Sequence, residues 1–228
     1  MTNNIAFIPL KTSSRRLPKK NFKNLKGIPI FNYALDAALK SKLFSKIILS
    51  TDNPKTIKEK LLYDDNKIEI LLRNNYESNI DISIKEVMYS QLHKYKNLNI
   101  DNVCLIYATA ALLTDKSLIN SYKKLKSKIN SVMGVSKVQP HPNRSFSLSN
   151  GKIFKFTNHA KLDPINWKDY YGSNGSIVWV KYQKFLMEKS FYIEPMNIEI
   201  FAKYEHIDID NKDDFDFLEK ILKLTQHE

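Results

Sequence analysis

The chain has 228 residues, 43% of them hydrophobic, and a formal net charge of +12. This length and apolar content suit a single domain over residues 1–228 with a sizeable core. No apolar stretch reaches the roughly 18 residues of a membrane helix, no leader-like segment precedes the first apolar run, and the lone Cys104 excludes an internal disulfide. A cytoplasmic protein without membrane contact is expected.

The positive charge does not predict nucleic-acid binding. The chain contains only four arginines, and the excess charge comes from lysines spread along its whole length. Proteins that bind bases and phosphates usually favour arginine because of its planar, bidentate guanidinium. Zinc-finger, basic-leucine and RNP-type motifs are also missing from the sequence. We therefore expect no nucleic-acid partner.

Short apolar runs alternate with amphipathic stretches over the first 138 residues. The apolar runs predict strands at 5–9, 47–49, 68–71, 102–107 and 131–138. The amphipathic stretches predict helices at 30–40, 54–62, 82–92 and 115–125. Strands that alternate with helices of this length imply crossover connections, so the expected fold is α/β, with a mainly parallel sheet covered on both faces.

The alternation stops after Val138. Residues of about 139–175 contain several prolines, a hairpin-like segment around 149–152 and an expected loop at 161–166. We interpret this segment as an insertion that projects from the sheet. Later segments predict strands at 177–181 and 207–210 and a final helix at 212–224.

The first strand opens into a loop rich in cations. Small polar residues follow Pro9, and then come Arg15, Arg16, Lys19 and Lys20. Backbone N–H groups in such a loop can approach a polyphosphate closely while the cations neutralise it. The carboxyl ends of parallel strands meet at one edge of a sheet, where ligands bind. That edge should also carry Thr51-Asp52, Arg73, Ala108–Ala111 and the Asp208–Asp210 segment, which together indicate a nucleotide site.

Asp208 and Asp210 are candidate ligands for magnesium. In a strand, residues i and i+2 point to one face, so both carboxylates converge while Ile207 and Ile209 face the core. Mg²⁺ binds one or two carboxylates together with phosphate oxygens and water. The sequence therefore predicts a Mg²⁺ site beside the nucleotide.

Four segments resemble the CMP-N-acylneuraminate synthetase (acylneuraminate cytidylyltransferase) family. They are Ile8–Asn21, Ile48–Asp52, Ser173–Ile177 and His206–Asp210. Two further segments, Ile106–Leu113 and Arg144–Leu148, are similar to the pseudaminic acid cytidylyltransferase branch of that family. Lys11 stands where the family usually has arginine. The resemblance covers nearly the whole chain.

The resemblance implies a Rossmann-like nucleotidyltransferase sheet with an inserted dimerisation arm, and therefore a homodimer. It implies an enzyme that joins CTP to a nine-carbon keto sugar acid, with pseudaminic acid as the expected sugar. The alternatives are sialic, legionaminic or 3-deoxy-octulosonic acid. From another class, a non-catalytic basic protein that binds nucleotides or RNA on the same fold is also possible.

The resemblance also implies roles for individual residues. Lys20 and Lys11 are expected to act in catalysis on the phosphates, and Asp208 and Asp210 to hold the metal. The nucleotide-binding residues are expected to be Leu10, Ser14, Arg15, Asn21, Arg73, Ser83, Ala108 and Thr109. The sugar-binding residues are expected to be Arg144, Lys161 and Asn174.

Overall fold

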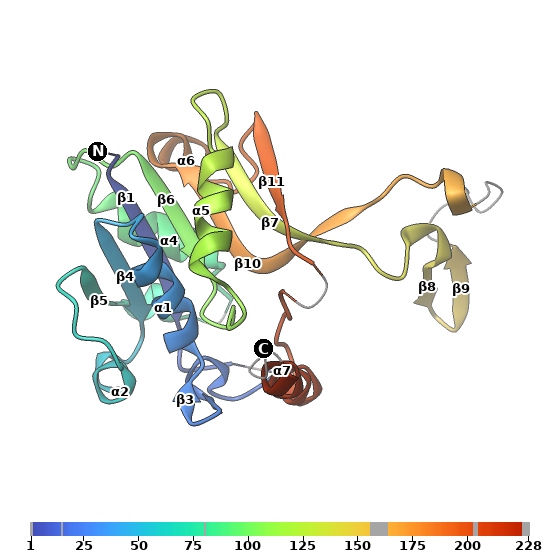
Figure 1. The fold of residues 1–228 in the computed structure, drawn as a ribbon, viewed down its shortest axis with the longest axis horizontal. Helices are drawn as coiled ribbons and strands as arrows, with labels where there is room; N and C mark the ends of the chain where they lie inside the picture. Colours follow the sequence, from blue (N-terminus) through green and yellow to red (C-terminus); the bar gives the residue numbers. More distant parts are fainter. Residues whose placement is uncertain (1, 15, 80, 156–163, 203–204, 225–228) are drawn as a thin grey trace.

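The computed structural model describes residues 2–14, 16–79, 81–155, 164–202 and 205–224. The strands are β1 (Asn4–Leu10), β2 (Asn24–Leu25), β3 (Ile28–Pro29), β4 (Lys46–Thr51), β5 (Ile68–Leu72), β6 (Asn102–Ile106), β7 (Ser131–Lys137), β8 (Phe146–Ser149), β9 (Lys152–Lys155), β10 (Tyr171–Lys181) and β11 (Met196–Ile200). The α-helices are α1 (Phe31–Ser41), α2 (Pro54–Lys60), α3 (Asn75–Ser78), α4 (Ile84–His93), α5 (Asp115–Lys124), α6 (Tyr182–Glu188) and α7 (Lys212–Leu224) (Figure 1). Short 3-10 helices are η1 (Lys20–Phe22), η2 (Pro142–Arg144) and η4 (Pro164–Asn166).

Seven strands form one sheet in the order β11-β7-β10-β6-β1-β4-β5. Every neighbouring pair is parallel except the two that involve β10, which lies antiparallel between β6 and β7. Because β10 is reversed, its amino-terminal end lies at the edge where the other six strands have their carboxyl ends. The predicted α/β fold with a mainly parallel sheet is confirmed.

Helices cover both faces of this sheet (Figure 1). Ala6 and Ile8 of β1 belong to the apolar cluster on the face of α1, α2 and α5. Ile5 and Phe7 belong to the cluster on the face of α4 and α6. A strand buried on both faces needs consecutive apolar residues, which is why continuous apolar runs predicted these strands correctly. Within the described residues, no helix combines the length and hydropathy needed to cross a membrane.

A third apolar cluster connects the loop after β1 to the end of the chain. Leu17 and Leu25 pack in this cluster with Ile209, Phe215 and Leu218. The cluster therefore holds the cation-rich loop next to the segment that carries Asp208 and Asp210, although about 190 residues separate the two in sequence.

The chain between β7 and β10 leaves the sheet and carries the hairpin β8–β9 at a distance from it (Figure 1). We call residues 138–170 the arm. The predicted hairpin is present, and Asn150 and Gly151 form its turn with φ values of 49° and 73°. Positive φ at both central residues is typical of a two-residue hairpin turn, and Asn-Gly adopts it readily.

Several predicted boundaries are wrong. β10 begins at Tyr171 rather than 177, and Tyr171 pairs with Lys137, so residues 171–175 belong to the sheet and not to the insertion. Residues 207–210 form no strand: the sheet ends at β11, and this later segment is irregular and pairs with no strand. Residues 164–166 form η4 rather than loop, and 161–163 lie outside the described residues.

Candidate active site

Loops at the carboxyl edge of the sheet surround one cavity of about 490 Å³, which we call the main cavity. Its wall comes from the segments after β1, β5, β6 and β11 and from the beginnings of α4 and β10. Nine of the predicted site residues line it: Lys11, Ser14, Lys20, Asn21, Arg73, Ala108, Thr109, Asp208 and Asp210. Segments far apart in the sequence therefore meet where the strand pattern placed them.

Two sets of hydrogen bonds fix the loop after β1. Asp52 follows β4, and its carboxylate accepts from the backbone N–H and the hydroxyl of Thr12, both at 2.8 Å. The amide of Asn21 donates to the carbonyl oxygen of Lys11 at 3.0 Å. The first set fixes the beginning of the loop beside β4, and the bond from Asn21 joins the two ends of the loop, so its backbone has a defined position beside the cavity.

Lys20 lies between the loop after β1 and the carboxylates. Its ammonium donates to the carbonyl oxygen of Ile209 at 2.8 Å and lies 3.7 Å from Oδ1 of Asp210. The bond to this backbone oxygen fixes the ammonium of Lys20 at the wall of the main cavity.

Arg73 is the buried cation of the main cavity, only 5% exposed. Its Nε donates to Oγ of Ser50 at 2.9 Å, while Nη2 has no hydrogen-bond partner among the described residues. Burial lowers the pKa of Arg73, although a guanidinium keeps its charge in proteins. An unpaired N–H on a buried guanidinium is costly, so this group favours a ligand that supplies an acceptor.

Asp208 and Asp210 both line the main cavity, as predicted, although they lie in an irregular segment. Ile209 between them is fully buried, which leaves both carboxylates on the cavity side. The carboxylate of Asp214 in α7 accepts from the backbone N–H of Asp210 at 2.8 Å and fixes this segment. Desolvation, followed by repulsion from Asp210, raises the pKa of Asp208. A cation beside this pair would relieve both effects.

The space in front of Asp208 fits a metal ion. Gly175 has φ +71°, and a Cβ at this position would lie 3.5 Å from the carboxylate atoms of Asp208, so glycine keeps this approach open. The described part of the chain holds no group of three or more acidic, histidine or cysteine ligands. Two carboxylates suit Mg²⁺, which fills its remaining positions with phosphate oxygens and water.

A second cavity of about 650 Å³ adjoins the main cavity, and Ser173 and Asp208 line both. Asn174 lies in its wall. The carbonyl oxygen of this side chain accepts from the N–H and the hydroxyl of Ser176 at 3.1 and 2.6 Å, and its amide donates to Oγ of Ser136 at 3.2 Å. These bonds fix the irregular part of β10 between Ser173 and Val178.

His206 also lines the second cavity and is 8% exposed. The backbone of Asn174 hydrogen-bonds to its ring, and Nε2 has no partner among the described residues. Burial lowers the pKa of His206 to about 4, so the ring is neutral at pH 7.

Three further predicted site residues, Leu10, Ser83 and Arg144, are not among the residues that line these two cavities. The Leu10 side chain is fully buried at the end of β1, and Ser83 caps α4 through a hydrogen bond from the N–H of Glu86. Arg144 lies in the arm, with its guanidinium 5.5 Å from the centroid of the Trp167 ring. Arg15 and Lys161 lie outside the described residues.

Some cavity residues were not selected from the sequence. Arg16 lines the main cavity, but in a run of four cations the sequence does not show which one faces inward. Ser173 and Gly175 lie in the family-like segment Ser173–Ile177, and His206 begins the family-like segment His206–Asp210. Their place in these segments was the sequence signal that could have identified them as cavity residues.

Comparison with known proteins identifies relatives over most of the chain. Pseudaminic acid cytidylyltransferase from Campylobacter jejuni is 26% identical over 99% of this chain and 98% of its own length. CMP-N,N'-diacetyllegionaminic acid synthase from Legionella pneumophila is 28% identical over 97% of each protein. This chain spans 35% of a longer Helicobacter pylori protein that combines pseudaminic acid cytidylyltransferase with a hydrolase, at 29% identity over 79% of this chain.

The fold is shared with a solved structure. CMP:2-keto-3-deoxy-manno-octonic acid synthetase complexed with CTP superposes with a TM-score of 0.70 over 98% of this chain and 100% of that one, at 11% identity. The sequence profile of the family described as Cytidylyltransferase matches residues 5–228. With a match over nearly its whole length and this nucleotidyltransferase fold, the chain belongs to the cytidylyltransferase family.

Proposed function

We propose that this enzyme transfers CMP from CTP to a nonulosonic acid, with pseudaminic acid as the substrate. The observation that carries the proposal is the pair of adjoining cavities that share Ser173 and Asp208. The main cavity combines cations with two carboxylates, which suits a nucleoside triphosphate and its metal. The second cavity offers a separate polar site for the sugar. Similarity to the Campylobacter jejuni enzyme supports the choice of sugar.

In the proposed reaction, the anomeric C2 hydroxyl of the sugar acid attacks the α-phosphorus of CTP. A new O–P bond forms, the bond from the α-phosphorus to the bridging oxygen breaks, the hydroxyl gives up its proton, and pyrophosphate leaves. Catalysis of this kind is mainly positioning and electrostatic stabilisation. Lys20 is proposed to neutralise the α-phosphate, and Lys11, Ser14 and Arg15 the β- and γ-phosphates. The proposed nucleotide contacts are Asn21, Arg73, Ala108 and Thr109, which line the main cavity, while Leu10 and Ser83 stay predictions from the resemblance alone.

Cytidylyltransferases of this fold generally use a divalent metal, and we propose that the metal here is Mg²⁺. Asp208 and Asp210 would hold it, and the clearance at Gly175 supports this placement. When bound, it would neutralise phosphate charge and favour loss of the hydroxyl proton.

We also propose a homodimer that uses the arm. Phe146, Leu148 and Ile153 are 64%, 73% and 71% exposed, and cross-strand pairing puts all three on one face of the hairpin β8–β9. A two-stranded hairpin with such a face is marginal in water unless something covers it. In a dimer, Arg144 and Lys161 of the arm could reach the sugar carboxylate of the other subunit.

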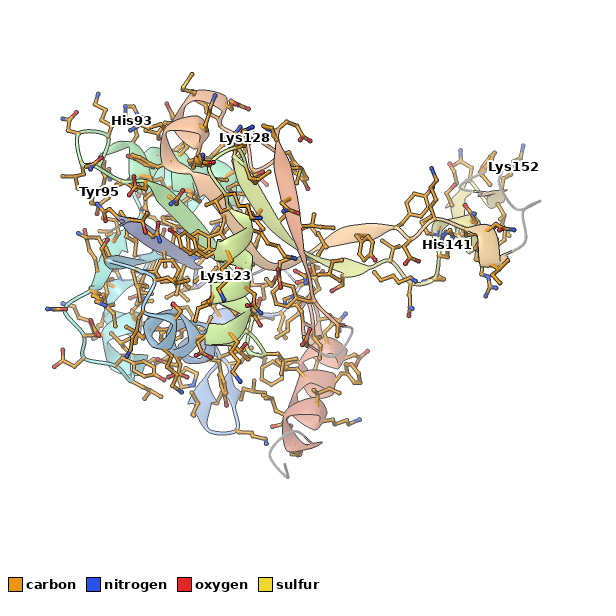
Figure 2. The ribbon with its side chains drawn as sticks, turned by 45° about the horizontal axis from the view of Figure 1, so that its top comes forward. His93, Tyr95, Lys123, Lys128, His141 and Lys152 are labelled. Atoms are coloured by element: carbon orange, nitrogen blue, oxygen red, sulfur yellow. The ribbon has the colours of Figure 1, made fainter. Side chains whose placement is uncertain are left out.

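The alternatives differ in sugar or in class. The Legionella pneumophila relative supports legionaminic acid almost equally well, and sialic and 3-deoxy-octulosonic acids remain candidates within the enzyme class. A non-catalytic protein that binds nucleotides or RNA would need a basic surface. The labelled Lys123, Lys128 and Lys152 lie on three separate parts of the molecule (Figure 2), which favours an enzyme without a nucleic-acid partner. The cytoplasmic location stays a prediction.

Pyrophosphate release from CTP and Mg²⁺ tests the proposal against a panel of pseudaminic, legionaminic, N-acetylneuraminic and 3-deoxy-octulosonic acids. We expect release with pseudaminic acid and none after EDTA is added. Release with another sugar alone would correct the substrate. CTP that does not bind at all would contradict the function, and salt-sensitive RNA binding without turnover would favour the other class.

Asp210→Asn tests the metal site, because it removes the negative charge of one proposed metal ligand and leaves a side chain of the same size. We expect a loss of at least 100-fold in turnover. Asp216→Asn makes the same chemical change on the exposed surface of α7 and should leave turnover unchanged. Full activity of Asp210→Asn would contradict the metal assignment.

A further inference from the structure

The two carboxylates of the proposed metal site have different partners. Nη1 of Arg16 lies 2.5 Å from Oδ2 of Asp210, and Nη2 lies 2.5 Å from Oδ1, so the guanidinium engages both oxygens of this carboxylate. In the described part of the chain, no ion pair engages Asp208. The carboxylate of Asp214 holds the backbone N–H of Asp210 and does not touch its side chain.

The same guanidinium faces the proposed phosphate site. Arg16 lines the main cavity together with Lys11 and Ser14, which are proposed to bind the β- and γ-phosphates. Its side chain is 67% exposed, so packing does not lock it in one rotamer. A guanidinium pairs with a phosphate in the same bidentate way as with a carboxylate. Arg16 thus has two anionic partners within one cavity.

We propose that Arg16 occupies Asp210 while the enzyme is empty and transfers to the triphosphate when CTP binds. In the empty enzyme the guanidinium competes with the metal for both oxygens of Asp210. After transfer, both oxygens of Asp210 are free for the metal, which therefore binds more tightly with the nucleotide than without it. Arg16 is a positioning residue in this scheme, and the inference rests on the proposed metal site.

The competition has a bounded size. Exposed ion pairs change equilibria by only about two- to fivefold, with bidentate arginine pairs at the upper end. Removing Arg16 should therefore tighten metal binding in the absence of CTP by about this factor, and it should not create a new site. A triphosphate carries several negative charges, so it easily outcompetes the single carboxylate for the guanidinium.

The test measures Mn²⁺ affinity by electron paramagnetic resonance without nucleotide, and CTP affinity by calorimetry in EDTA. Arg16→Gln is compared with Lys19→Gln, which removes one positive charge from an exposed side chain of the same loop. We expect Arg16→Gln to bind Mn²⁺ two- to fivefold more tightly than Lys19→Gln does, and CTP at least threefold more weakly. Arg16→Lys keeps the charge without the fork and should lie between wild type and Arg16→Gln.

Asp208→Asn, introduced into wild type and Arg16→Gln, separates this inference from the proposed metal site. Equal Mn²⁺ affinities for Arg16→Gln and Lys19→Gln, with binding lost when Asp208→Asn is added to wild type or to Arg16→Gln, would overturn the role of Arg16 and keep the metal site. Mn²⁺ affinity that is unchanged by Asp208→Asn would overturn both the role of Arg16 and the proposed metal site. Undetectable Mn²⁺ binding in wild type and in Arg16→Gln would also overturn the inference, because it requires a site that holds the metal without nucleotide and that Arg16 only weakens.

Discussion

The ammonium of Lys20 is held between the two candidate metal ligands, where it donates to the carbonyl oxygen of Ile209 at 2.8 Å. Lys20 is proposed to contact the α-phosphate, and such a contact strengthens as charge builds there in the transition state. Lys20→Met should therefore lower kcat by about 100-fold and change KM for CTP little. Steady-state kinetics measures both constants, and Lys19→Met serves as the exposed control. An unchanged kcat in Lys20→Met would show that the contact makes no contribution in the transition state.

His206 should make stability depend on pH. Its pKa is about 4 in the folded chain against 6.5 in an unfolded one, so between these values the unfolded state binds the additional proton. Stability is therefore present above pH 6.5 and falls as the pH drops towards 4, by about 2 kcal/mol between pH 7 and pH 5. Urea unfolding of His206→Gln should show a correspondingly smaller fall. His93→Gln, at an exposed position, should behave as wild type does.

Two strands that the sequence failed to predict, β11 and the first half of β10, both lack a continuous apolar run. β11 reads Met-Asn-Ile-Glu-Ile and is only partly buried, because an edge strand needs no continuous apolar run. The first half of β10 is polar and contains glycines because its side chains line cavities instead of filling a core. Interior strands such as β1 and β6 obey the apolar pattern and were predicted from it. Elements that form a site depart from the rules that identify a core.

The site residues show the same division. The end of β5 could be placed from the parallel topology, so Arg73 was correctly expected at this edge; Asp208 and Asp210 also lie there, although they belong to no strand. The inward orientation of Arg16 depends on the fold of a whole loop, and no local pattern encodes it. Arg144 lies in the arm, and no local pattern encodes the path of the arm away from the sheet.

Two glycines of β10 offer a matched test at the level of one strand. Gly175→Ala forces a side chain into positive φ, at a cost of about 1–2 kcal/mol, and places a methyl group beside Asp208. Turnover should fall strongly. Gly172→Ala should be tolerated, since its φ is ordinary and its Cβ would lie 3.6 Å from Val138. Equal effects of the two substitutions on turnover would remove any special role of Gly175.

For the whole molecule, the arm predicts a change in subunit assembly. Leu148→Glu puts a charge in the exposed apolar face of β8–β9 and should convert the proposed dimer into a monomer, as measured by analytical ultracentrifugation. Ser147→Glu lies on the opposite face of the same strand and should keep the dimer. A wild-type protein that sediments as a monomer at micromolar concentration would contradict the dimer altogether.

The reversed strand β10 is the stem of the arm and also a wall of both cavities. The chain leaves the sheet at Lys137 and returns at Tyr171, directly opposite in the ladder, so residues 138–170 begin and end at neighbouring positions. Such a segment can be transplanted between relatives as a cassette without disturbing the parallel strands. The graft would carry the proposed dimer face together with the arm residues proposed to contact the sugar, while the proposed phosphate site of the main cavity would remain with the host.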